Sequence, residues 1–82
     1  MTIYRFNFYA IEDGNLKDGS VVTMERPFFT RRELAIIRTE LAFTSEMADN
    51  KPAICCVWAD EHLKFVVTMQ DGRIGYVRGN AA

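Results

Sequence analysis

The sequence is poor in side chains that bind metals or form cross-links: its 82 residues include two cysteines and one histidine. Cys55 and Cys56 are adjacent, and neighbouring residues of a strand point to opposite faces, so the two thiols cannot easily bond to each other or join distant segments. Too few ligands remain for a zinc site. We therefore expect reduced, buried thiols, no disulfide, no metal and no other cofactor.

Long apolar runs and an excess of one charge are also missing. No run approaches the roughly 20 residues that span a bilayer. The formal net charge is −1, which supplies no general attraction to nucleic acid or to an anionic membrane. The chain starts with the strand-like TIYRFNFYAI and not with a basic and apolar leader. These features predict a cytoplasmic protein that does not bind membranes.

The composition that is present, 49% hydrophobic and 26% charged, is typical of one globular domain, here residues 1–82. A domain of this size buries only about 60% of its unfolded surface, so a partner subunit would add usefully to its stability. We expect oligomerisation, with a homodimer as the simplest form.

The first 29 residues predict two strands. Tyr4, Phe6 and Phe8 alternate with Arg5 and Asn7, which is the pattern of a half-buried strand. Residues 12–20 contain two Asp-Gly pairs, 13–14 and 18–19, and both predict turns. A second strand follows over residues 20–28, and Pro27 is expected to mark its end because proline cannot donate to a ladder.

A helix is predicted over residues 31–48. Thr30 and Glu33 have the spacing of a capping box, in which each side chain binds the other residue's amide. Phe29, just before the cap, is expected to pack against Leu34. Asn50 and Pro52 end the helix.

The last third of the sequence predicts three strands joined by short turns. Residues 52–60 are apolar on both faces, as in a central strand. In residues 63–69, Leu63, Phe65, Val67 and Met69 alternate inward, and Asp71-Gly72 predicts a hairpin to a last strand at 74–78. Residues 79–82 are expected to fray. The prediction is an α+β fold of order ββαβββ, with one mostly antiparallel sheet and one helix on one face.

The helix carries more apolar residues than one buried stripe needs. At about 100° per residue, one arc holds the sheet-facing set Leu34, Ile37, Leu41 and Ala48, and a second arc holds Ile36, Phe43 and Met47. Either both arcs are buried, with Glu40 at the margin, or the second arc is exposed. An exposed apolar stripe on a small protein usually marks an interaction site.

The second sheet face raises the same problem, because a single helix covers only one face. We predict that Cys55, Val57, Val66 and Val77 lie on the uncovered face, together with Arg5, Asn7, Lys64 and Thr68. An uncovered face of this composition would be unusually apolar, and a second chain packed there would resolve it.

Catalytic chemistry has weak support. A thiol–imidazole pair from Cys55 or Cys56 and His62 is disfavoured because the thiols lie within an apolar strand, where a thiolate is destabilised. Asp60 and Glu61 beside His62 indicate a solvated turn more than a metal site. The Asp-Gly pairs lack the spacing of phosphate or calcium loops. No enzymatic activity is predicted.

Four arginines surround the predicted helix start: Arg26, Arg31, Arg32 and Arg38. The helix dipole disfavours Arg31 and Arg32 in the first turn, and an anionic partner would reverse that effect. The simpler interpretation pairs the arginines with Glu25, Glu33 or Glu40. The aromatic residues show no RNA-recognition signature, and Tyr4, Phe6 and Phe8 are more simply core.

In general architecture, a compact hairpin–helix–sheet protein without catalytic residues resembles the small accessory proteins of phages and mobile elements, which often inhibit host enzymes or defence complexes by surface binding. No motif carries this resemblance.

Our leading hypothesis is a non-enzymatic protein-binding module that blocks or regulates a larger protein. Its anchors would be Ile36, Phe43 and Met47, and its charged rim Arg31, Arg32 and Arg38. The alternative is a nucleic-acid-binding module that uses the arginines at the helix N-terminus. An enzyme, the third hypothesis, requires a pocket with convergent polar groups.

Overall fold

The computed structural model describes residues 1–78 and confirms the predicted element order. The elements are β1 (Thr2–Glu12), β2 (Asn15–Arg26), α1 (Arg31–Met47), β3 (Ala53–Ala59), β4 (His62–Gln70) and β5 (Arg73–Arg78). The predicted fraying concerns residues 79–82, which lie outside the described residues. Within residues 1–78, no helix is both long enough and apolar enough to cross a membrane.

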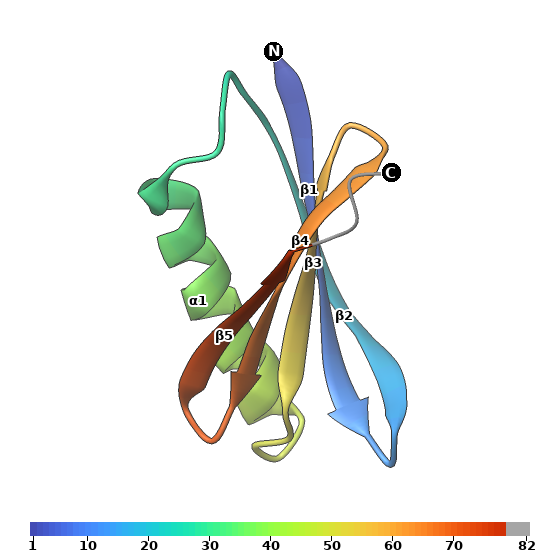
Figure 1. The fold of residues 1–82 in the computed structure, drawn as a ribbon. Helices are drawn as coiled ribbons and strands as arrows, with labels where there is room; N and C mark the ends of the chain where they lie inside the picture. Colours follow the sequence, from blue (N-terminus) through green and yellow to red (C-terminus); the bar gives the residue numbers. More distant parts are fainter. Residues whose placement is uncertain (79–82) are drawn as a thin grey trace.

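The five strands form one antiparallel sheet in the order β2-β1-β3-β4-β5. Because β2 and β3 both pair antiparallel with β1, they run in the same direction on either side of it. A connection between two such strands must cross the sheet, and α1 makes this crossing on one face. Figure 1 shows the resulting two layers, with a strongly twisted sheet and α1 lying along one side of it.

Aspartates in the left-handed backbone region form the tight turns between strands. Asp13 and Gly14 both have positive φ, as do Asp71 and Gly72, which is the pattern of a two-residue hairpin turn. Asp60 has a φ of 54° at the β3–β4 turn. Two of the predicted Asp-Gly pairs, 13–14 and 71–72, are therefore confirmed as hairpins.

The prediction of a turn at Asp18-Gly19 is wrong, because both residues lie inside β2, which begins at Asn15. The β1–β2 register shifts between Asn7 and Tyr9. A Cβ placed on Gly19 would lie 2.8 Å from the carbonyl oxygen of Phe8. This glycine therefore permits a close approach of two backbones at a strand irregularity, which is a common role of glycine within strands.

The core lies between α1 and the centre of the sheet. Ile37 and Leu41 are fully buried, as the helical periodicity predicted, and Leu34 packs at the edge of the core. Phe29, predicted to pack against Leu34, makes edge-to-face contacts with three rings, those of Tyr4, Phe6 and Phe65, at centroid separations of 5.8, 6.1 and 4.9 Å. The segment before the helix is thus part of the core.

The predicted facing of β3 is wrong. Cys55 and Val57 are fully buried in the core and do not lie on the uncovered face. The reason is register: Phe6 pairs with Val57 and Phe8 with Cys55, and directly paired residues share a face. A strand that is apolar on both faces has no internal signal for its facing, so only its neighbours decide it. Leu63, predicted inward, pairs with Trp58 of the uncovered face after a register shift.

Candidate protein-binding groove

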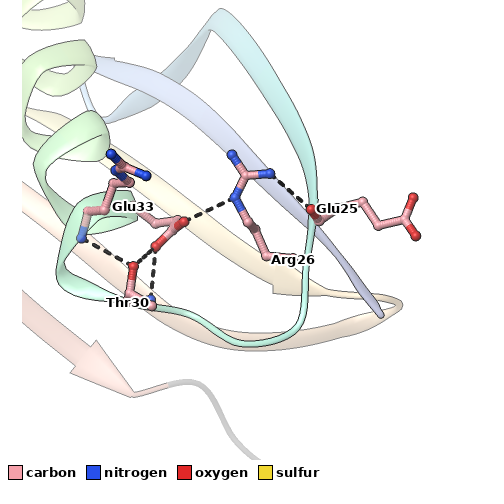
Figure 2. A network of polar contacts seen from close by, with 5 residues as sticks. Glu25, Arg26, Thr30 and Glu33 are labelled. Atoms are coloured by element: carbon pink, nitrogen blue, oxygen red, sulfur yellow. Dashed lines mark hydrogen bonds and ion pairs between the residues drawn. The ribbon is translucent and has the colours of Figure 1, made fainter.

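The start of α1 is fixed by a network of polar contacts around Glu33 (Figure 2). The Glu33 carboxylate accepts hydrogen bonds from the Thr30 amide at 3.0 Å and from the Thr30 hydroxyl, and it pairs with Arg26 Nε at 3.3 Å. The Thr30 hydroxyl accepts from the Arg32 amide at 3.3 Å. The predicted capping box is therefore confirmed, and Arg26 extends it to the end of β2.

Glu33 is buried, with 2% of its surface exposed. The hydrogen bond from the Thr30 side chain is the main cause that lowers the pKa of Glu33, and backbone donors and Arg26 add to it. Burial acts in the opposite direction and is the smaller effect. Glu33 is therefore a structural anion that holds the end of β2 against the first turn of α1.

The outer stripe of α1 consists of Ile36, Glu40, Phe43 and Met47, which follow one another at helical spacing. Phe43 is 59% exposed and Met47 83% exposed, while Ile36 and Glu40 are partly buried. Within the described residues, the outer stripe is therefore only partly shielded from solvent. The helix packs mainly over β1, β3 and β4. The stripe faces β2, because Phe43 and Met47 line one hollow together with residues 17–20 of that strand.

The space between α1 and β2 is a groove with two hollows, which we name the α1–β2 groove. The first hollow, of about 420 Å³, lies at the C-terminal end of the helix. Phe43 and Met47 form its helical wall, and Lys17, Asp18 and Ser20 of β2 line the other side. This hollow combines two exposed apolar anchors with polar groups of both charges.

The second hollow, of about 590 Å³, lies toward the helix start. It is lined by Ile36, Arg32 and Thr39 of the helix and by Arg26 of β2. Glu40 lines both hollows and accepts a hydrogen bond from the Ser20 hydroxyl at 3.4 Å. This contact bridges the helix and β2 between the two hollows.

The structure separates the predicted rim arginines. Arg32 lines the second hollow beside Ile36. Arg31 is exposed at the helix start. Arg38 lies on the other flank of α1, where its Nη2 is 3.4 Å from the hydroxyl of Tyr76 on β5. Arg26 is engaged by Glu33 and by the carbonyl of Glu25. The arginines therefore do not form one continuous cationic patch.

The remaining candidate chemistry is not assembled into a site in the described part of the chain. Burial raises the pKa of the Cys55 thiol to about 12, and burial also raises the pKa of Cys56. His62 is exposed at the start of β4. No group of three or more histidine, cysteine or acidic residues within residues 1–78 is placed to hold a metal ion.

The contribution of β2 to the groove was not predicted. Lys17, Asp18 and Ser20 belong to a segment that the sequence assigned to a turn or to the start of a strand. Nothing in their pattern shows that α1 would be displaced from β2. The only sequence signal was Glu40, a charged residue between two apolar arcs, whose partner across the groove is Ser20.

Together these features define a small α+β protein with a groove between its helix and an edge strand. Comparisons with models of protein families, with curated proteins and with solved structures found no match. The geometry of the chain itself is therefore the basis for a functional assignment.

Proposed function

We propose that this protein is a non-enzymatic, cytoplasmic protein-binding module that docks to a larger protein through the α1–β2 groove and thereby blocks or regulates it. The observation that carries the proposal is the pair of exposed anchors, Phe43 and Met47, beside a hollow of about 420 Å³. Aromatic and methionine side chains are enriched at protein interfaces, and a few such anchors can supply most of the binding energy.

The edge position of β2 adds a second means of recognition. As the first strand in the sheet order, β2 has one side without a neighbouring strand. An extended segment of another protein can pair with such an edge and place alternate side chains in the adjacent groove. The partner that fits best would pair with β2 through main-chain hydrogen bonds and bury apolar side chains against Phe43 and Met47.

The charges of the groove restrict the partner further. Arg32 in the second hollow has no acidic partner among the described contacts, whereas Lys17 of the first hollow lies 3.8 Å from Glu12. An acidic side chain near the helix start and an apolar one near its end would therefore complement the groove. Such a pattern would fix the direction in which the segment lies.

A Phe43→Asp variant tests this function. Because Phe43 is mostly exposed, we expect the melting temperature to change by no more than a few degrees. The set of proteins captured from native lysate, measured by quantitative mass spectrometry, should lose at least one member that the wild type retains. Arg38→Ala, on the other flank of the helix, is the matched control and should retain that member.

Two outcomes would contradict the proposal. Equal capture by wild type and Phe43→Asp would show that the groove is not the binding site. A folding collapse of the variant would place Phe43 in the core. The nucleic-acid alternative makes a different prediction: binding at low salt that weakens with a log–log slope of about one per phosphate contacted and that is lost in Arg31→Ala and Arg32→Ala.

A further inference from the structure

We propose that the sheet face opposite α1, here named the open face, is covered in solution by a second copy of this chain, forming a two-fold β-sandwich. The face lies on the other side of the sheet from the α1–β2 groove. The two surfaces share one residue, Asp18, which pairs with Tyr9 of the open face and also lines the first hollow of the groove. The dimer contact is otherwise separate from the groove.

The open face is unusually apolar for a surface. Four apolar residues distributed over its strands are strongly exposed: Ile3 at 50%, Leu16 at 54%, Val21 at 56% and Val77 at 61%. Further apolar residues on this face are partly buried, among them Ile11, Ile54, Trp58 and Val66. Scattered exposed apolar residues are normal, but a continuous set on one sheet face is typical of an interface.

The register arranges these side chains in rows across the strands. The middle row is Val21, Asn7, Cys56, Val66 and Val77; the row on one side contains Thr23, Arg5, Trp58 and Leu63; the row on the other side contains Asp18, Tyr9, Ile54, Thr68 and Gly75. Four of the five residues of the middle row are apolar or thiol side chains. Among their paired residues, the rows that flank it carry one charge each, Arg5 and Asp18. Two further charges of this face, Glu25 opposite Ile3 and Arg73 opposite Gln70, lie in the outermost rows.

The charges favour a second copy over an unrelated partner. A two-fold axis that crosses the strands at the middle row places the Arg5 row of one copy over the Asp18 row of the other. Measured along the interface, Arg5 is then offset from Asp18 of the second copy by about one strand spacing, roughly 4.8 Å, and the two side chains meet across the gap of about 10 Å between packed sheets. The two-fold symmetry makes this contact occur twice. Opposite charges meet, while Val21 and Val77 each face their own equivalents.

Arg5 is already held in place for this contact. Its guanidinium lies 5.4 Å from the centre of the Trp58 ring, and its Nε donates to Asn7 Oδ1 at 3.2 Å. An arginine stacked on an aromatic ring loses little further conformational freedom on binding, and its remaining N–H groups stay available to a carboxylate. Covering the pair with a second sheet would also exclude water and strengthen both interactions.

The area of the open face is sufficient for a stable dimer. With about 4.8 Å between strands and about 6.8 Å between rows, each outward residue covers roughly 33 Å², and the 20 outward positions of the five strands give a face of roughly 650 Å². Two such faces would bury about 1,300 Å² in total, which falls within the standard range of specific protein interfaces, about 1,200–2,000 Å².

The first experiment measures the mass of the full chain by light scattering at about 100 μM, roughly a hundredfold above a micromolar dissociation constant. We expect a dimer. Val77→Lys places like charges opposite each other at the interface and should raise the dissociation constant by at least about 100-fold. Because the Val77 side chain is 61% exposed in the single chain, we expect the variant to stay folded. Its melting temperature checks this expectation.

A charge exchange tests the orientation. Arg5→Glu and Asp18→Arg should each weaken the dimer, because each brings two like charges together. The double variant restores opposite charges and should recover the dimer. Phe43→Asp, on the far side of the sheet, should leave the dimer unchanged.

Cys56 gives a second readout because it lies at the centre of the face, in the middle row of the middle strand. Its alkylation by a small maleimide should slow as protein concentration rises, and this dependence should vanish in Val77→Lys. Cys55 is buried in the core on the opposite face and should stay unreactive in the folded protein at every concentration. Alkylated Cys56 should in turn prevent dimer formation.

Three results would overturn the proposal: a monomer at about 100 μM, a dimer that Phe43→Asp dissociates while Val77→Lys does not, or failure of the Arg5 and Asp18 exchange to restore association. The second result would assign the dimer contact to the groove. The third would exclude the proposed two-fold orientation.

Discussion

Glu33 is the one charged side chain that is buried among the described residues, and its surroundings explain why it can be. Thr30 supplies a hydroxyl and an amide donor, and Arg26 supplies a guanidinium. A buried carboxylate without such partners would be strongly destabilising. The same residue therefore caps the helix and joins the end of β2 to it, two tasks that a capping box on an isolated helix does not combine.

The pH dependence of stability should reveal this residue. The pKa of Glu33 is lowered in the folded state, so its ionised form stabilises the fold above the ordinary glutamate pKa of about 4.3, and this stabilisation is lost as the pH falls through the lowered value. Glu33→Gln keeps a hydrogen-bonding cap but removes the charge. Urea unfolding between neutral and acidic pH should show a smaller loss of stability on acidification in the variant than in the wild type. If the unfolding free energies of wild type and Glu33→Gln fell equally with pH, the stabilising role of the Glu33 charge would be contradicted.

The α1 element has two apolar arcs with different roles. Ile37 and Leu41 are fully buried against the sheet, whereas Phe43 and Met47 are mostly exposed beside β2. A helix centred over the sheet would bury more of the second arc. Because α1 packs mainly over β1, β3 and β4, the edge strand β2 is left with an inner face that a partner can reach.

The β2 element depends on Gly19. A methyl group there would lie 2.8 Å from the Phe8 carbonyl oxygen, so Gly19→Ala must move one backbone relative to the other. We expect the variant to lose about 1–3 kcal/mol of unfolding free energy in urea denaturation. Ser20→Ala, one residue further along the exposed strand, is the control and should stay within about 0.5 kcal/mol of the wild type. An equal loss in both variants would refute the close-approach explanation.

At the scale of the whole molecule, the two proposed surfaces lie on opposite sides of one sheet. The groove is built by α1 and β2, and the open face by the outward side chains of all five strands. A two-fold dimer through the open face would therefore carry two grooves pointing outward. Two linked sites can bind a bivalent or repeated target more tightly than either site alone.

The independence of the two surfaces is testable. Val77→Lys should dissociate the dimer but preserve capture of the groove's partner, with affinity reduced only by the loss of the second site. Phe43→Asp should abolish capture and preserve the dimer. Both variants can be compared by light scattering and by quantitative capture. Loss of both properties in one correctly folded variant would show that the two surfaces are one.

The sequence by itself determined the elements of this protein. The alternation of apolar and polar side chains predicted β1, the Thr30–Glu33 capping box predicted the start of α1, and Asp-Gly pairs predicted two hairpins. Each of these signals depends only on neighbours along the chain. The fold class followed from element order and short connections. Ile37 and Leu41 were placed in the core by helical period alone, and the structure confirms both.

Tertiary structure alone decided how these elements face one another. β3 is apolar on both sides, so its pairing with β1, and not its own pattern, put Cys55 and Val57 in the core. The same is true of Gly19, whose role depends on the distant Phe8 backbone, and of the groove, which exists because α1 is displaced from β2. In a strand that is apolar on both sides, periodicity reports only which residues share a face, and contacts between segments distant in sequence determine which face is covered.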